Sequence, residues 1–234
     1  MIPQRALLAA LVASATGQLA CSEIVGIEER SGSWCTLEAA DSDFCEDFDH
    51  EPPFSVWSTG GSPRTTASDR SEPNALLAAT GTTLRRSFPE ARGALSIALD
   101  LRFGEPKADF TAIDHAVMRV SRGADAIGLF TGPSGRLVFG RDPLGEQLPT
   151  TLAGGQWKHF VISIDGDGAE GMHASLAVDG ETFETTKIEP QGEPEPDGDK
   201  GTSLVIGAEP VVSGTKPIEC IIDNVTVDGA GVAP

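Results

Sequence analysis

The chain has 234 residues and a formal net charge of −18, with 17 Lys and Arg against 35 Asp and Glu. Binding to nucleic acid relies on Lys and Arg side chains that neutralise phosphates, so this composition argues against a nucleic-acid partner. The length suits one sizeable domain with its own hydrophobic core.

The N-terminus carries the pattern of an export signal. Arg5 precedes a run of apolar and small residues from Ala6 to Ala15, as in a secretory signal peptide. The run is shorter than the ~20 apolar residues that span a bilayer. We therefore expect residues 1–20 to be a signal peptide. Their removal takes away Arg5 and no acid, which leaves 16 basic and 35 acidic residues, a charge of −19.

The residues that follow the apolar run resemble a bacterial lipobox. They read Leu19–Ala20–Cys21, with Gln18 where leucine is usual. The resemblance implies that Cys21 becomes the lipidated first residue of the mature protein, held to the membrane by its acyl chains. Cleavage nearby, with Cys21 left as a free thiol, is the alternative. We expect residues 21–43 to be a tether and the protein to be exported to the bacterial cell envelope, lipid-anchored at the outer membrane or cell surface.

The remaining cysteines are Cys35, Cys45 and Cys220. In an exported protein such residues suggest a disulfide. Pairing Cys35 with Cys45 closes a short loop, which stabilises the fold by about 2–3 kcal/mol, and leaves Cys220 as a buried thiol in a strand. We favour this pair. The alternative, Cys45 with Cys220, would join the first and last strands.

Most of the mature sequence predicts short strands. Residues 95–103 alternate between apolar and polar, which predicts a half-buried strand with Ser96, Asp100 and Arg102 on one face. Residues 126–142 predict a hairpin with its turn at GPSG, and residues 156–165 and 173–183 predict two further strands. Strands at short intervals, separated by Gly, Pro and Asp, indicate an all-β sandwich. The acidic, Pro-rich residues 189–201 predict an exposed loop.

The sequence GGQWKHFVISIDGDGAEGMHASLAVDGE, with LVIGA and IIDNVTV downstream, resembles laminin-G-like domains of the concanavalin A-like lectin/glucanase class. The resemblance implies a two-sheet antiparallel jelly-roll sandwich with one concave sheet and with the first and last strands adjacent. We assign this domain to residues 44–229 and a tail to residues 230–234. A galactose-binding-like jelly roll is the alternative fold. In the resembling domains a tryptophan opens a core strand, so a packing role is expected for Trp157.

The same resemblance raises the prospect of a structural calcium ion. Asp47 or Asp49 near the first strand could approach Asp223 near the last, because this class pairs those strands, and carboxylates are suitable calcium ligands. The competing interpretation is that Asp223 and Asn224 satisfy backbone groups at a strand edge. No other cofactor is predicted. GDGAEG at residues 166–171 lacks the helix that a dinucleotide site requires.

The sequence predicts no catalytic residues. EDFDHE at residues 46–51 approaches the E-x-D-x-x-E motif of the β-glucanases, but Phe48 stands at the aspartate position. There is no Tyr, the usual proton carrier of lyases on related sandwiches. His159 is expected at the surface or rim. We therefore favour a non-catalytic module that binds a polysaccharide or a surface protein. A glycoside hydrolase with an unconventional carboxylate pair and a passive envelope component are the alternatives.

Overall fold

The computed structural model describes residues 33–88, 93–107, 109, 111–122, 125–141, 143, 146–152, 154–165, 172–188 and 201–229. The chain divides into two compact units, Met1–Gly32 and Ser33–Pro234. All described residues belong to the second unit. The predicted signal peptide, Cys21 and the tail lie outside the described residues. Within the described part, no helix is long and apolar enough to cross a membrane.

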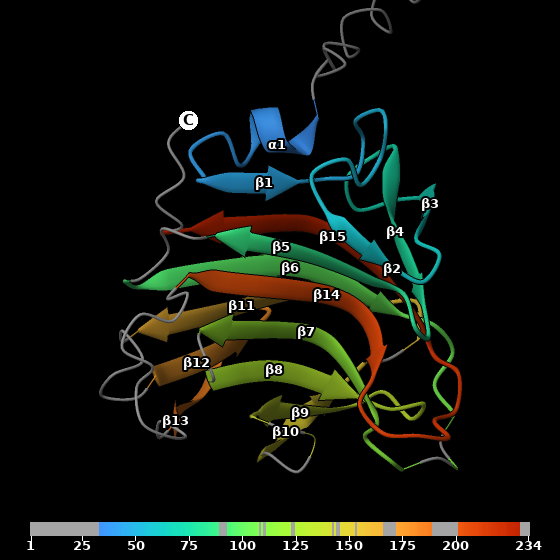
Figure 1. The fold of residues 1–234 in the computed structure, drawn as a ribbon. Coiled ribbons are helices and arrows are strands. Elements are labelled where there is room, and N and C mark those ends of the chain that lie inside the picture. The colour runs from blue at the N-terminus through green and yellow to red at the C-terminus, as the bar shows by residue number, and fades with distance from the viewer. Residues whose placement is uncertain are drawn as a thin grey trace, which may run out of the picture. The chain divides into compact units, whose positions relative to one another are not determined.

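The described strands form two antiparallel sheets, one behind the other in Figure 1. Sheet A contains, from edge to edge, β13 (Glu181–Ile188), β12 (Met172–Val178), β11 (Trp157–Asp165), β6 (Leu95–Phe103), β15 (Glu219–Asp228), β4 (Asn74–Ala79) and β3 (Arg64–Ala67), and β1 (Phe44–Glu46) also pairs with β15. Sheet B contains β10 (Glu146–Thr151), β9 (Arg136–Gly140), β8 (Asp125–Thr131), β7 (His115–Arg122), β14 (Thr202–Pro210), β5 (Thr83–Phe88) and β2 (Ser58–Gly60). The predicted all-β fold, a two-sheet jelly-roll sandwich, is confirmed.

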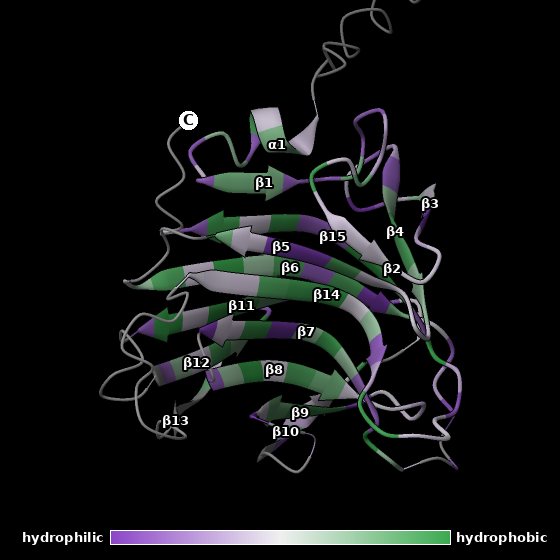
Figure 2. Ribbon diagram, viewed as in Figure 1, coloured by the Kyte–Doolittle hydropathy of each residue, from purple (hydrophilic) through white to green (hydrophobic). Residues whose placement is uncertain are grey.

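The core lies between the sheets and follows the alternation of the sequence. In β6, Leu99 and Leu101 are buried, and Asp100 between them points to the opposite face because successive side chains of a strand alternate. In β11, Phe160 and Ile162 are buried in the same core. Apolar and polar segments alternate along the ribbons of the central strands in Figure 2. The period-two pattern therefore decides which side chains of sheet A face outward.

The N-terminal part of the domain is tied to its last strand. β1 pairs with β15, with Phe44 opposite Val227, as the resemblance implied for the first and last strands. A short helix, α1 (Trp34–Leu37), precedes β1, and the sequence had placed these residues in a tether. A disulfide joins Cys35 to Cys45 and thereby holds α1 against β1.

Cys220 lies in β15 as a free and fully buried thiol. Burial raises the pKa of this thiol to about 12. Because the thiolate is the reactive form of cysteine, Cys220 is chemically inert in the folded domain. The pairing of Cys35 with Cys45 leaves it as a packing residue.

Candidate functional site

The outer face of sheet A, turned away from sheet B, carries a connected set of polar side chains. We call Arg70, Asp100, His159, Asp223 and Asn224 the Asp100 cluster. Asp100 comes from β6, His159 from β11, and Asp223 and Asn224 from β15, three neighbouring strands of the sheet. Arg70 comes from the loop between β3 and β4. The cluster is therefore assembled from four distant segments of the sequence.

Asp100 is the centre of the cluster. Its carboxylate accepts hydrogen bonds from His159 Nδ1 at 2.9 Å, Arg70 Nε at 2.9 Å and Asn224 Nδ2 at 2.8 Å. The side chain is 3% exposed. Burial alone would raise the pKa of Asp100, but these three donors outweigh it and lower the pKa. Asp100 is thus a buried anion that orients three neighbouring side chains.

A β-bulge in β15 brings Asn224 into this arrangement. The register between β15 and β6 shifts between Asp223 and Thr226, and Asn224 has a φ of 52°. Asparagine accepts this left-handed conformation more readily than most residues. A bulge of this kind redirects a side chain, and here it lets the Asn224 amide reach Asp100. The amide oxygen of Asn224 is buried and has no hydrogen-bond partner among the described residues.

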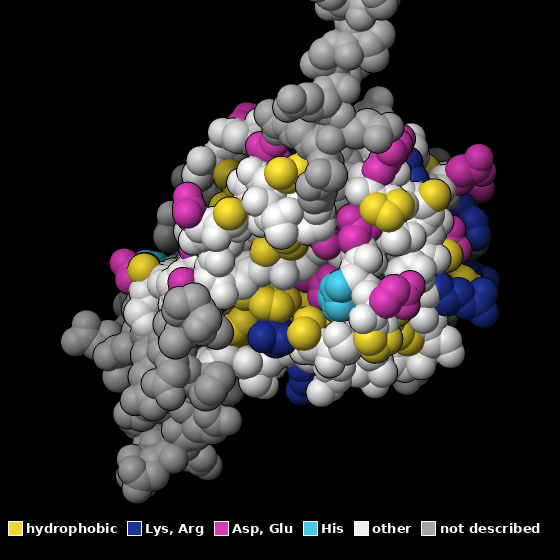
Figure 3. Space-filling model, turned by 90° about the horizontal axis from the view of Figure 1, so that it is seen from above, with side chains coloured by type: hydrophobic (Ala, Val, Ile, Leu, Met, Phe, Trp, Pro, Cys, Tyr) yellow, Lys and Arg dark blue, Asp and Glu magenta, His cyan; other side chains and the backbone are white. Residues whose placement is uncertain are grey.

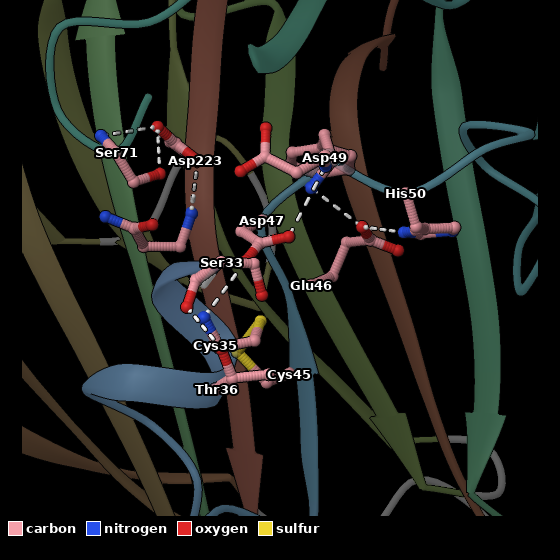
Figure 4. The surroundings of a disulfide bond; sticks show 12 residues. Ser33, Cys35, Thr36, Cys45, Glu46, Asp47, Asp49, His50, Ser71 and Asp223 are labelled. Carbon is pink, nitrogen blue, oxygen red and sulfur yellow. Dashed lines mark hydrogen bonds and ion pairs between the residues drawn. A yellow bond between two sulfur atoms is a disulfide. The ribbon is translucent and has the colours of Figure 1, made fainter. Parts of the chain in front are cut away.

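Asp223 anchors the loop that carries Arg70. Its Oδ2 accepts hydrogen bonds from Ser68 Oγ at 2.6 Å and Ser71 Oγ at 2.9 Å, and Figure 4 shows the contact with Ser71. Asp223 has no exposed surface. Burial raises its pKa to about 6, although the hydrogen bonds from the two serines act in the opposite direction. The two serines therefore fix both ends of the Ser68–Ser71 loop to the sheet.

The same loop contacts the aromatic end of β11. Asp69 accepts hydrogen bonds from Trp157 Nε1 and Arg102 Nη1, each at 2.8 Å. The Arg102 guanidinium lies 4.9 Å from the centre of the Trp157 ring. Trp157, for which a packing role was expected, packs against Arg102 on the outer face of the sheet and lies outside the core. The inward residues of β11 are Phe160, Ile162 and Ile164. Trp157 is three positions before Phe160, so its indole points to the opposite, outer face, where it is half-buried.

Two members of the cluster are accessible to a ligand. The side chains of Arg70 and His159 are 46% and 39% exposed, respectively. Asp100 occupies Nδ1 of the imidazole, so Nε2 is the nitrogen left for a ligand. A guanidinium and an oriented imidazole side by side offer hydrogen bonds to hydroxyl or carboxylate oxygens.

A hollow of about 540 Å³ lies on the same sheet, beyond the Asp100 cluster along the strands. Its lining includes Asp228 of β15, Ser96 of β6, Ser163 of β11 and Ser175 of β12. These four residues form one row across the sheet, since Ser96 is opposite both Asp228 and Ser163, and Ser163 is opposite Ser175. Small hydroxyl side chains in a row leave an open surface with hydrogen-bonding groups at its base.

The structure does not gather the predicted calcium ligands. Asp47 accepts a hydrogen bond from the backbone N–H of Cys35, and Asp49 accepts one from that of Asn74. Figure 4 shows Asp47 beside the disulfide and Asp223 directed at Ser71. Among the described residues, no group of three or more His, Cys, Asp or Glu side chains is placed to hold a metal ion. The three aspartates hold backbone and serine groups, and calcium binding stays a prediction.

A second constellation, in sheet B, has a structural role. His115 Nδ1 lies 2.6 Å from Asp114 Oδ1, and its Nε2 lies 3.1 Å from Thr80 Oγ1. This order of hydroxyl, imidazole and carboxylate resembles a hydrolase triad. His115 is fully buried, however, and Thr80 Oγ1 accepts the backbone N–H of Ile218 at 2.8 Å. The three side chains connect the turn after β4 to Ile218, the residue before β15, and the buried imidazole does not reach a substrate at the surface.

Comparisons with known proteins identify the fold. No model of a known protein family matches the sequence, and a search of curated proteins finds no relative. The cellulose-induced protein Cip1 is similar in structure, with a TM-score of 0.58, 12% identity, and coverage of 80% of this chain and 97% of that chain. The endo-β-1,4-glucuronan lyase of the fungus Trichoderma reesei has a TM-score of 0.56 at 12% identity, covering 80% and 95%.

The alginate lyase Aly36B is similar too, with a TM-score of 0.55, 12% identity, and coverage of 79% of this chain and 96% of that chain. The chain has their fold. At this level of identity the likeness concerns the jelly-roll sandwich alone, in agreement with the concanavalin A-like resemblance of the sequence. The role of the outer face of sheet A therefore depends on its own residues.

Sequence reasoning found part of this site. It placed Ser96, Asp100 and Arg102 on the polar face of one strand, as the structure has them. It placed His159 at the surface or rim, and the structure has it 39% exposed on the outer face of an interior strand. It named neither the Ser68–Ser71 loop nor the contact of Arg70 with Asp100. One feature of the sequence could have located the site. Trp157 and His159 are two positions apart in β11, so their side chains lie on the same face, which is the face that carries Asp100.

Proposed function

We propose that this protein is a cell-envelope module that binds a glycan on the outer face of sheet A, without catalysis. The observation that carries the proposal is the Asp100 cluster, in which a buried carboxylate fixes the exposed Arg70 and His159 side chains beside a hollow lined with serines. Fixed polar groups around an open surface are typical of sites that bind hydroxyl-rich ligands. Similar structures include proteins named as acting on glucuronan and alginate, which supports a glycan over a protein partner.

The proposal includes the location of the protein. The apolar run and the cysteine at position 21 predict export and attachment to the membrane through a lipid. The disulfide between Cys35 and Cys45 supports an oxidising compartment, because such bonds are rare in the cytosol. The domain would then meet glycans outside the cell.

Catalysis at the same face is the second candidate. His159 is oriented by Asp100 in the way that a carboxylate orients a general base. This imidazole could abstract a proton from a bound sugar, and the adjacent Arg70 could stabilise the charge that develops on an acidic group.

The hydrolase alternative meets a physical obstacle. Asp100 and Asp223 lie opposite each other in neighbouring strands, and their pKa values are shifted in opposite directions, as an acid and base pair requires. Asp100 is 2% exposed and Asp223 is 0% exposed. Neither carboxylate reaches a sugar at the surface, so the pair does not suit glycosidic cleavage.

The test uses the full-length chain in affinity gels that contain polysaccharides, with newly formed reducing ends and unsaturated sugar ends measured in parallel. We expect retention without cleavage. Arg70→Ala should reduce retention by about three- to tenfold, because one charge-assisted hydrogen-bond donor is lost. Arg85→Ala is the matched control, since Arg85 is exposed on β5 of the other sheet. Equal retention of the two variants would reject this face as the binding site.

Cleavage would decide for the second candidate. New chain ends that disappear in His159→Gln, with retention unchanged, would assign the imidazole to catalysis. Neither retention nor cleavage on any polysaccharide would contradict both candidates and favour a protein partner or a passive role in the envelope.

A further inference from the structure

The row of side chains at the base of the hollow has one charged end. Ser96 and Ser175 are half-buried, and Ser163 and Asp228 are exposed. Neighbouring strands are about 4.8 Å apart, so the row extends over about 14 Å. Three hydroxyls that donate and accept, followed by a carboxylate that only accepts, form this surface. A ligand that matches it has several hydroxyls and one strong donor.

Three cations of this face are paired with acidic side chains. Arg70 is paired with Asp100, and Arg102 with Asp69. Lys158 is paired with Asp179 at 2.5 Å. Among the described residues that line the hollow there is no Lys or Arg; the lining includes Asp165, Asp228 and His173. The charge of Asp165 interacts with that of Arg122, so the exposed Asp228, at the end of the row, is the acidic group that a ligand would meet.

The overall charge of the chain has the same sign. The chain as a whole carries a charge of −18, and Figure 3 shows Asp and Glu side chains on the end of the domain that carries α1 and β1. The carboxylate of Asp228 at the end of the serine row favours a ligand that supplies donors and positive charge at that end.

We propose that the hollow binds an amino sugar. Its ammonium group lies on Asp228, and its ring hydroxyls hydrogen-bond to the row formed by Ser96, Ser163 and Ser175. The ligand is accordingly a glycan with free amines and without carboxylates or sulfates. This inference rests on the proposed function, glycan binding by the outer face of sheet A, and specifies the class of glycan.

The test is isothermal titration calorimetry of the full-length chain with four oligosaccharides of equal length, at low and at physiological salt. They are a glucosamine oligomer, its N-acetylated form, a neutral gluco-oligomer and an oligoglucuronate. We expect the glucosamine oligomer to bind about fivefold tighter than its N-acetylated form, the size expected for one exposed ion pair. The oligoglucuronate should bind most weakly, and added salt should reduce the preference for the amine.

Two variants locate the site. Asp228→Asn should remove the preference for the amine and leave binding of the neutral oligomer within about twofold. Ser163→Leu should weaken every oligosaccharide, because its side chain fills the hollow. Glu105→Gln is the control for the loss of one negative charge elsewhere on the surface, since Glu105 is exposed and follows the far end of β6. This variant should bind all four oligosaccharides as the wild type does.

Three results would overturn the inference: equal binding of the N-acetylated form, tighter binding of the oligoglucuronate, or an amine preference that persists in Asp228→Asn. An oligolysine peptide of the same charge tests for simple attraction of cations. If it binds as tightly as the glucosamine oligomer and depends equally on Asp228, the site is not one for sugars. Retention of glycans without an amine preference would refute only this inference, whereas no retention at all would refute the proposed function.

Discussion

The buried carboxylate of Asp223 makes a prediction about stability and pH. Its pKa is raised from 3.8 to about 6 in the folded domain, a difference of about 2.2 pH units. The folded state therefore binds more protons than the unfolded state between these values. Where the folded state binds more protons than the unfolded state, the free energy of unfolding falls as the pH rises. At 1.36 kcal/mol per pH unit, about 3 kcal/mol of the free energy of unfolding is lost as the pH rises from below 3.8 to above 6.

The measurement compares the wild-type chain with Asp223→Asn by urea unfolding at several pH values, with tryptophan fluorescence as the signal. Carboxylates distant from Asp223 titrate equally in both proteins, so the difference in the free energy of unfolding reports Asp223 together with its neighbour Asp100. Relative to the variant, we expect the wild type to lose about 3 kcal/mol across this pH window. A flat difference, or a wild type that gains stability as the pH rises, would refute the reasoning. Such a result would mean that the hydrogen bonds from the serines lower the pKa of Asp223 at least as much as burial raises it.

Three further predictions concern single residues. Asp100→Ala should lower the free energy of unfolding by about 1–3 kcal/mol, since it leaves the buried Asn224 amide without its acceptor, whereas the exposed side chains of Arg70 and His159 turn to water. Urea unfolding measures this, and an unchanged free energy of unfolding would show that water replaces the carboxylate at Asn224 as well. Removal of the disulfide by a double Cys35→Ser and Cys45→Ser change should cost about 2–3 kcal/mol, seen as a lower Tm, whereas an unchanged Tm would mean that β1 needs no such clip. Cys21→Ser should move the exported protein from the membrane to the soluble fraction, and continued membrane association would reject the lipid anchor.

The fold was predictable because alternation is a local property of the sequence. The predicted strand forms β6 (Leu95–Phe103), and Leu99 and Leu101 face the core as their spacing requires. Residues 126–142 contain the predicted hairpin as β8 and β9. In each case apolar side chains two positions apart determine the face of the strand, and no distant residue is needed.

The Asp100 cluster was not predictable in the same way. Arg70 and Asp100 are 30 residues apart, and His159 and Asp100 are 59 apart. Their contact depends on the order of strands in sheet A and on the anchoring of the Ser68–Ser71 loop by Asp223, which is 155 residues from Ser68. The sequence does show which side chains share a face. It does not show which strands are neighbours.

The clip between Cys35 and Cys45 determines how the domain responds to tension along its N-terminal segment. A pull on the residues before Cys35 bypasses the connection between Cys35 and Cys45 and reaches the fold directly at Cys45 in β1. There the load falls on the short β1–β15 ladder, from Phe44 to Glu46. The outer face of β6 and β11 lies beyond that ladder in the sheet. A strained attachment could therefore loosen β1 while the surface around Asp100 keeps its shape.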